Sequence, residues 1–131
     1  MKPITKEPIR LLLIDDEEAF VRVLTKRMTK RQIDVTPAFS GTEALQRMRQ
    51  ADFDVAMLDL KMEGMDGIEV LKILKQMVPE LPVIMLTGHG CQVSAQDALA
   101  NGAFDYLSKP YDFEDLLQKI REAYQSGKDA L

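Results

Sequence analysis

The sequence predicts an α/β fold: a doubly wound, five-stranded parallel sheet with helices on both faces. Five short apolar runs alternate with five amphipathic segments along the chain, a pattern typical of right-handed β-α-β units and a parallel sheet. Three of the runs are apolar enough for central strands, whereas the other two carry polar residues that suit sheet edges. The strand order 2-1-3-4-5 satisfies both requirements.

Each expected strand is short, and all but the second are followed directly by a polar residue. Central strands are expected at residues 9–14, 55–58 and 83–86. Their nearly continuous apolar composition is that of strands buried on both faces. Edge strands are expected at residues 34–38 and 105–108. Pro37 lacks a backbone N–H and therefore confines its strand to an edge of the sheet.

Amphipathic segments between the strands predict the helices. The first places four apolar side chains on one helical face, namely Phe20, Val23, Leu24 and Met28. A second helix is expected from Ser40, and a third at residues 68–77, ending before Pro79.

The last two expected helices differ in the strength of their apolar stripe. The fourth, at about residues 91–100, has mainly Ala95, Ala98 and Leu99 to bury, and Asn101-Gly102 would close it. The fifth follows the helical spacing with five residues: Phe113, Leu116, Leu117, Ile120 and Tyr124.

The chain of 131 residues is expected to form a single domain, with its core at about 9–124 and a polar tail at 126–131. Its net charge of -4 repels a phosphate backbone, so we expect no direct binding of nucleic acid. Its single cysteine cannot form an internal disulfide. No apolar run approaches the roughly 20 residues that cross a bilayer, so we expect a cytoplasmic protein without membrane association.

Five chemically active residues lie where the expected strands end: Asp15, Asp16, Asp59, Thr87 and Lys109. In such a sheet the carboxyl ends of the strands meet at one crevice. Paired carboxylates there repel by about 4 kcal/mol at 4 Å in an effective dielectric of 20, so they need a counter-cation. Lys109 supplies one positive charge, and all-oxygen ligands accompanied by waters favour Mg²⁺ over Ca²⁺ for the rest.

A carboxylate beside Mg²⁺ that keeps one oxygen free can accept a phosphoryl group. Asp59 is the expected acceptor because it ends a central strand, between the acidic pair on one side and Thr87 and Lys109 on the other. The metal and the lysine would neutralise charge on the transferred group, and the threonine hydroxyl would hydrogen-bond it.

From Ile9 to about Tyr124 the chain resembles the receiver domain of two-component response regulators, a flavodoxin-like fold. The matching motifs, in chain order, are Leu12-Leu13-Ile14-Asp15-Asp16-Glu17, Met57-Leu58-Asp59-Leu60-Lys61-Met62, Gly64-Met65-Asp66-Gly67, Leu86-Thr87-Gly88 and Gly102-Ala103-Phe104-Asp105-Tyr106-Leu107-Ser108-Lys109-Pro110.

The resemblance implies that Asp59 receives its phosphoryl group from a phosphohistidine on a sensor histidine kinase or histidine phosphotransfer protein. It implies Mg²⁺, with Mn²⁺ as a substitute, bound by Asp16, Asp59 and the backbone carbonyl of Lys61, and by Asp15 through a water. The family usually has proline where this chain has Glu63. The chain would not be an enzyme, and at most it would remove its own phosphoryl group slowly.

The resemblance also implies a switch. Lys109 would pair with the acyl phosphate, helped by a cis Lys109-Pro110 bond. Thr87 would swing toward the phosphoryl group and Tyr106 would turn inward into the space that opens. The face of the fourth helix, fifth strand and fifth helix would then change for downstream partners or a phosphorylation-dependent homodimer.

Other interpretations fit parts of the sequence. Asp15 and Glu18 have the spacing of a helix capping box. An FMN-binding flavodoxin would need a phosphate loop where this chain has acidic residues, and a dinucleotide fold would need G-x-G-x-x-G there. A haloacid-dehalogenase-type phosphatase would need a second acid at Lys61. The FMN binder is the rival from another class, and a receiver that binds partners without phosphorylation is the main structural alternative. The chain is either a stand-alone receiver or a fragment of a longer protein.

Overall fold

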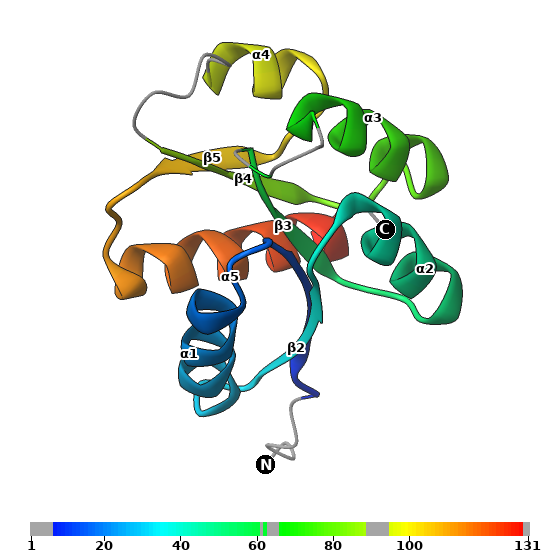
Figure 1. Ribbon diagram of the computed structural model, residues 1–131. Coiled ribbons are helices and arrows are strands. Elements are labelled where there is room, and N and C mark those ends of the chain that lie inside the picture. The colour runs from blue at the N-terminus through cyan, green and yellow to red at the C-terminus, as the bar shows by residue number, and fades with distance from the viewer. Residues whose placement is uncertain (1–6, 61, 63–65, 89–94, 130–131) are drawn as a thin grey trace.

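The computed structural model describes residues 7–60, 62, 66–88 and 95–129. Their five strands form one parallel sheet in the order β2-β1-β3-β4-β5, which confirms the predicted topology (Figure 1). The strands are β1 (Ile9–Ile14), β2 (Ile33–Ala38), β3 (Val55–Asp59), β4 (Val83–Thr87) and β5 (Asp105–Ser108).

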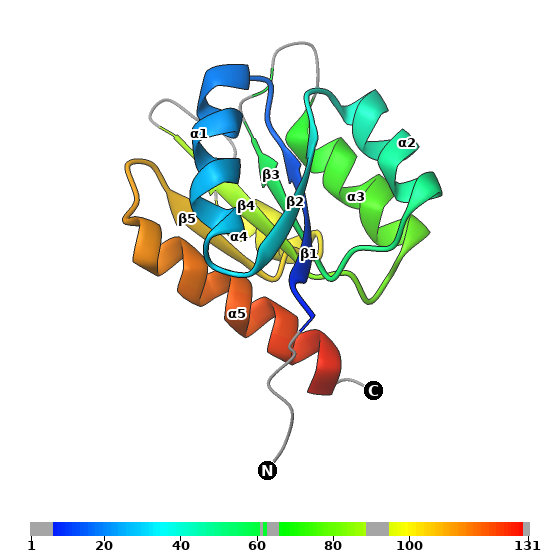
Figure 2. The ribbon, with the colours of Figure 1, turned by 90° about the horizontal axis from the view of Figure 1, so that it is seen from below.

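Helices cover both faces of the sheet, with α1 and α5 on one side and α2, α3 and α4 on the other (Figures 1 and 2). They are α1 (Glu18–Thr29), α2 (Gly41–Gln50), α3 (Gly67–Met77), α4 (Ala95–Ala100) and α5 (Phe113–Asp129). The predicted start of the fourth helix, residues 91–94, lies outside the described residues.

The core has two halves because successive side chains of a strand point to opposite faces of the sheet. Leu11 and Leu13 of β1 pack in the cluster formed with α1 and α5. Leu12 and Ile14 pack in the cluster formed with α2, α3 and α4. All four side chains are fully buried, so β1 is central, as its composition predicted.

Polar side chains fix the starts of two helices. At α2 the Ser40 hydroxyl accepts from the Glu43 N–H (3.1 Å), and the Glu43 carboxylate accepts from the Phe39 N–H (2.9 Å). At α3 the Asp66 carboxylate accepts from the Ile68 N–H (2.9 Å). These bonds satisfy backbone donors that a helix start leaves free.

The start of α1 differs from the predicted capping box. Glu17 occupies the N-cap position and makes no side-chain cap bond. The Asp15 carboxylate instead accepts from the Glu17 N–H at 3.0 Å, two residues ahead of it. Asp15 therefore organises the turn before the helix rather than capping the helix itself.

Two predicted core positions are wrong, and one helix is longer than predicted. Val23 is 60% exposed, whereas Val21 is buried with Leu24 and Met28. Leu99 of α4 is 44% exposed, and Ala98 is the buried residue of that helix. The fifth helix was expected to end near Tyr124, but α5 continues through the supposed polar tail to Asp129.

Candidate functional site

Three carboxylates gather at the carboxyl edge of the sheet. Asp15 and Asp16 follow β1, and Asp59 is the last residue of the neighbouring strand β3. Each offers an oxygen, and these oxygens all lie within 4.8 Å of one another. Asp15 is fully buried and Asp59 is 3% exposed, whereas Asp16 is partly open to solvent. The predicted acidic cluster is therefore present.

Strand pairing holds the two buried carboxylates in place. The Asp15 N–H donates to the Ala38 carbonyl of β2 at 3.0 Å. Asp59 lies in register with Leu86 of β4, and the next N–H, of Leu60, donates to the Leu86 carbonyl at 3.0 Å. The backbone at each of these two acids is thus hydrogen-bonded to a neighbouring strand, which holds both residues in position.

The electrostatics of the cluster favour a cation. The pKa of Asp15 is raised to about 6, mainly by burial and to a smaller extent by the neighbouring Asp59, against the lowering effects of the Glu17 N–H and of Lys109. The Asp15 Oδ2 atom is buried and has no hydrogen-bond partner within the described part of the chain. A buried charged oxygen without a partner is costly unless an ion or water satisfies it.

These residues fit Mg²⁺. Three carboxylates provide only hard oxygen ligands, and the unsatisfied Asp15 oxygen gives such an ion a place to neutralise charge. The predicted backbone ligand, Lys61, lies outside the described residues, as does Glu63.

Lys109 reaches the cluster from the end of β5. Its Nζ lies 3.4 Å from Asp59 Oδ2 and 5.5 Å from the centre of the Phe20 ring. Its side chain is 29% exposed, so one side faces the buried acid and the other faces solvent. The Lys109-Pro110 peptide bond is cis, as the family resemblance implied.

The two residues predicted to switch lie on β4 and β5. The Thr87 hydroxyl lies 3.3 Å from the Leu107 carbonyl and 3.3 Å from the Ser108 hydroxyl, so it is engaged with β5. Tyr106 of β5 is 37% exposed. Their predicted movements stay predictions.

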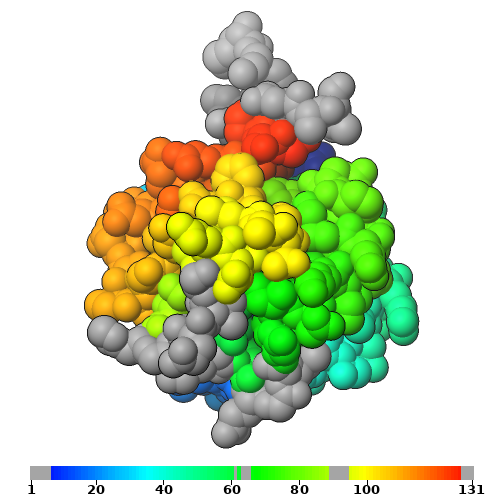
Figure 3. All heavy atoms as spheres, turned by 90° about the horizontal axis from the view of Figure 1, so that it is seen from above, coloured from blue at the N-terminus to red at the C-terminus, as the bar shows by residue number. Residues whose placement is uncertain are grey.

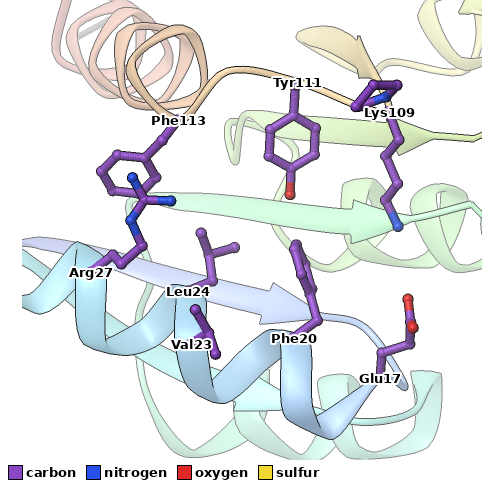
Figure 4. Close-up of a pocket in the computed structure, with 9 residues that line it drawn as sticks. Glu17, Phe20, Val23, Leu24, Arg27, Lys109, Tyr111 and Phe113 are labelled. Carbon is purple, nitrogen blue, oxygen red and sulfur yellow. The ribbon is translucent and has the colours of Figure 1, made fainter.

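A pocket beside Lys109 was not predicted from the sequence (Figure 4). It has a volume of about 350 Å³ and is lined by Glu17, Phe20, Val23, Leu24, Arg27, Lys109, Pro110, Tyr111 and Phe113. Arg27 stacks on the Phe113 ring at 3.8 Å. The pocket therefore lies between α1 and the segment that joins β5 to α5, next to the acidic cluster.

Tyr111 points its hydroxyl into this pocket (Figure 4). The hydroxyl oxygen is buried and has no hydrogen-bond partner among the described residues. Burial, with Asp15 and Asp59 nearby, raises the pKa of the phenol. Sequence patterns gave no signal for Tyr111 or Ser108, because their roles depend on side-chain directions at one strand end.

The family model of the response regulator receiver domain matches residues 11–121. The chain belongs to this family. Such domains bind Mg²⁺ at an acidic pocket and interact with histidine kinases. This chain has a cluster of acids in Asp15, Asp16 and Asp59.

Similar curated proteins are transcriptional regulators of two-component systems. The chain is 34% identical over 127 residues to the transcriptional regulatory protein GlrR of Escherichia coli (strain K12), covering 97% of this chain and 29% of that protein. It is 37% identical over 111 residues to the DNA-binding transcriptional regulator NtrC of Klebsiella pneumoniae, covering 85% of this chain and 24% of that protein. The chain thus spans less than a third of the length of these relatives.

Solved structures agree with the family. A response regulator receiver domain protein from Clostridium thermocellum matches with a TM-score of 0.88 and 33% identity, over 94% of this chain and 99% of that one. NtrX from Brucella abortus, in complex with ADP, matches with a TM-score of 0.84 and 26% identity, over 92% of this chain and 27% of that one. Of the helices described here, none combines the length and apolarity needed to cross a membrane.

Proposed function

We propose that this receiver domain accepts a phosphoryl group on Asp59 and changes shape in response. The observation that carries the proposal is the setting of Asp59: a buried carboxylate 3.4 Å from Lys109 Nζ, in a cluster with Asp15 and Asp16. A structural acid at a strand end needs a single counter-charge, whereas this arrangement concentrates three acids around one lysine.

The proposed donor is a phosphohistidine on a sensor histidine kinase or a histidine phosphotransfer protein. An Asp59 carboxylate oxygen attacks phosphorus, the phosphorus–nitrogen bond breaks, and the imidazole nitrogen leaves with the electron pair. The products are an acyl phosphate on Asp59 and a free histidine. Mg²⁺, or Mn²⁺ in its place, would be held by Asp16, Asp59, the Lys61 carbonyl and, through water, Asp15, and would neutralise charge on the phosphoryl oxygens.

Residues on the other side of Asp59 hold and report the phosphoryl group. Lys109, already within reach of Asp59 Oδ2, pairs with a phosphoryl oxygen. The Thr87 hydroxyl leaves β5 to hydrogen-bond another, and Tyr106 turns inward. The face of α4, β5 and α5 then differs between the two states and is the surface read by an output partner or by a second phosphorylated copy.

The donor is proposed to dock over the pocket between α1 and the β5–α5 connection. This pocket shares Lys109 with the acidic cluster, so a partner seated there has its phosphohistidine beside Asp59. Its walls are largely apolar, and Val23 stands exposed at its edge. Burying such a surface provides the affinity, while Glu17 and Arg27 offer charges that select the partner.

The domain acts on no other substrate in this proposal. It catalyses its own phosphorylation and, at most, the slow hydrolysis of its own acyl phosphate. Its output depends on a change of shape rather than on catalytic turnover. The alternative, a binding module that is never phosphorylated, differs in one measurable property: it gains no phosphoryl group.

Intact-protein mass spectrometry after incubation with acetyl phosphate and Mg²⁺ measures that property. We expect one added phosphoryl group on the wild type, none on Asp59→Ala, and one on Asp52→Ala, a matched change at an exposed acid. Labelling of Asp59→Ala, or no labelling of the wild type, contradicts the assignment of the acceptor. Omission of Mg²⁺, with EDTA present, is expected to abolish labelling.

A further inference from the structure

Ser108 is the last residue of β5 and lies directly opposite Thr87 in the register of the two strands. Its hydroxyl oxygen lies 3.3 Å from the Thr87 hydroxyl oxygen. The Ser108 side chain is exposed, so it takes no part in the core. Its contact with Thr87 therefore stands apart from the packing that holds the sheet together.

The two hydroxyls and the Leu107 carbonyl can be satisfied as one chain of hydrogen bonds. The Thr87 hydroxyl has a single proton and lies 3.3 Å from two acceptors, the Leu107 carbonyl and the Ser108 hydroxyl. When the proton goes to the carbonyl, the Ser108 hydroxyl can donate its own proton to the Thr87 oxygen. The carbonyl belongs to the backbone and would be present with any side chain at that position. Of the two groups that contact the Thr87 hydroxyl, only the Ser108 hydroxyl depends on which residue stands at its position.

The backbone around this contact is tightly held. The Lys109 N–H donates to the Thr87 carbonyl at 2.7 Å, which joins the ends of β4 and β5 next to Asp59. A rotation of the Thr87 side chain can therefore exchange its hydrogen-bond partners while the strand ends stay paired. Whether the Thr87 hydroxyl stays on β5 or turns toward Asp59 depends on the hydrogen-bond partners available at each place.

Resting on the proposed function, we propose that Ser108 is a positioning residue that holds the Thr87 hydroxyl on β5 and opposes its movement to the phosphoryl group on Asp59. An interaction made in one state only shifts the equilibrium between the states by its own free energy. The oxygen–oxygen distance of 3.3 Å is long for a hydroxyl pair. The expected shift is therefore modest, about two- to fivefold.

Binding of beryllium fluoride in excess Mg²⁺ tests the proposal, because the beryllium fluoride complex binds to a carboxylate oxygen and mimics a phosphoryl group. Titration of the chain is expected to give an apparent Kd about two- to fivefold lower for Ser108→Ala than for the wild type. Ser108→Thr keeps a hydroxyl at the position and is expected to stay near the wild-type value. Ser126→Ala, the same change at an exposed site on α5, is the matched control and is expected to match the wild type.

A double-mutant cycle separates this role from a general loosening of β5. In a Thr87→Ala background there is no hydroxyl to restrain, so adding Ser108→Ala is expected to leave the Kd unchanged. An equal effect in both backgrounds, an unchanged Kd for Ser108→Ala alone, or weaker binding by that variant overturns the role of Ser108. Failure of the wild type to bind beryllium fluoride with Mg²⁺ present overturns the proposed function itself and the inference with it.

Discussion

The two sides of Asp59 are built differently. On the β1 side, Asp15 is fully buried, and so are Leu13 and Ile14, the last two residues of the strand. On the β5 side, every residue of the strand is at least partly exposed, and Tyr106 is 37% exposed. The helix that covers this side, α4, buries only Ala98 among its six described residues and stands out on the surface beside α3 (Figure 3).

The difference assigns separate tasks to the two sides. A fully packed strand pair holds carboxylates in fixed positions, which suits metal binding and phosphoryl acceptance. A thin, half-exposed layer has few apolar contacts to lose and rearranges at low cost, which suits a switch. Lys109 joins the two sides, because it follows β5 and contacts an acid of β3.

The largest expected effect follows from cutting this link. Lys109→Ala is expected to accept a phosphoryl group from acetyl phosphate but to lose most of the conformational response, because the ion pair between the charged group and the residue that follows β5 is lost. Tryptic cleavage rates and NMR shifts of β4, β5 and α4, measured before and after phosphorylation, report the response. A response as large as that of the wild type would contradict the division between the two sides.

A smaller effect is expected from relieving the charge on the fixed side. Without metal, Asp15→Asn is expected to raise the free energy of unfolding by about 1–3 kcal/mol at pH 7, since the buried carboxylate loses its charge. An asparagine still offers an oxygen to the Glu17 N–H, which the aspartate bonds at 3.0 Å. Urea unfolding in EDTA at several pH values measures the difference.

The pH dependence of that difference has a fixed sign. The pKa of Asp15 is about 6 in the folded chain, against an ordinary value of 3.8. Between these values the folded state keeps a proton that the unfolded state has released, so the stability of the wild type falls as pH rises through this window. The advantage of Asp15→Asn is thus near zero below the window and complete above it; an advantage that is largest at low pH would refute the assigned cause.

The smallest of these effects concerns the donor's docking surface. Val23→Arg places a long charged side chain at the edge of the pocket and is expected to slow transfer from a phosphorylated histidine kinase several-fold, about 1 kcal/mol. Transfer from acetyl phosphate is expected to be unaffected. Ile73→Arg, at an exposed apolar position of α3 on the opposite face, is the matched control; equal slowing by both variants would argue against docking at the pocket.

The sheet and the acidic cluster could be predicted from the sequence because both follow from local patterns. In the run of residues 9–14, the last four residues are buried on both faces of the sheet, and the apolar composition shows this. Once strands are parallel, the residues that follow them must meet at one edge, so Asp15, Asp16, Asp59 and Lys109 could be placed together without knowledge of their side-chain directions.

The predictions were wrong or missing where the sequence pattern fits more than one arrangement of the side chains. Val21 and Val23 both fit an apolar stripe with Leu24, and the way α1 packs in the assembled core decides that Val21 is the buried one. The predicted end of α5 is too early because Ser126 and Gly127 are weaker helix formers than alanine or leucine, yet the helix passes through both. The contact between Thr87 and Ser108 depends on rotamers at a strand end, about which a sequence pattern carries no information.

An NMR titration in two steps tests the central claim, that a fixed acidic side and a mobile reporting side meet at Asp59. We predict that Mg²⁺ alone shifts amide signals near Asp15, Asp16 and Asp59 and leaves those of Tyr106 and α4 in place. Beryllium fluoride added afterwards is predicted to shift Thr87, Tyr106 and α4. No shift with Mg²⁺, or a full shift of the β5 side with Mg²⁺ alone, would contradict the account.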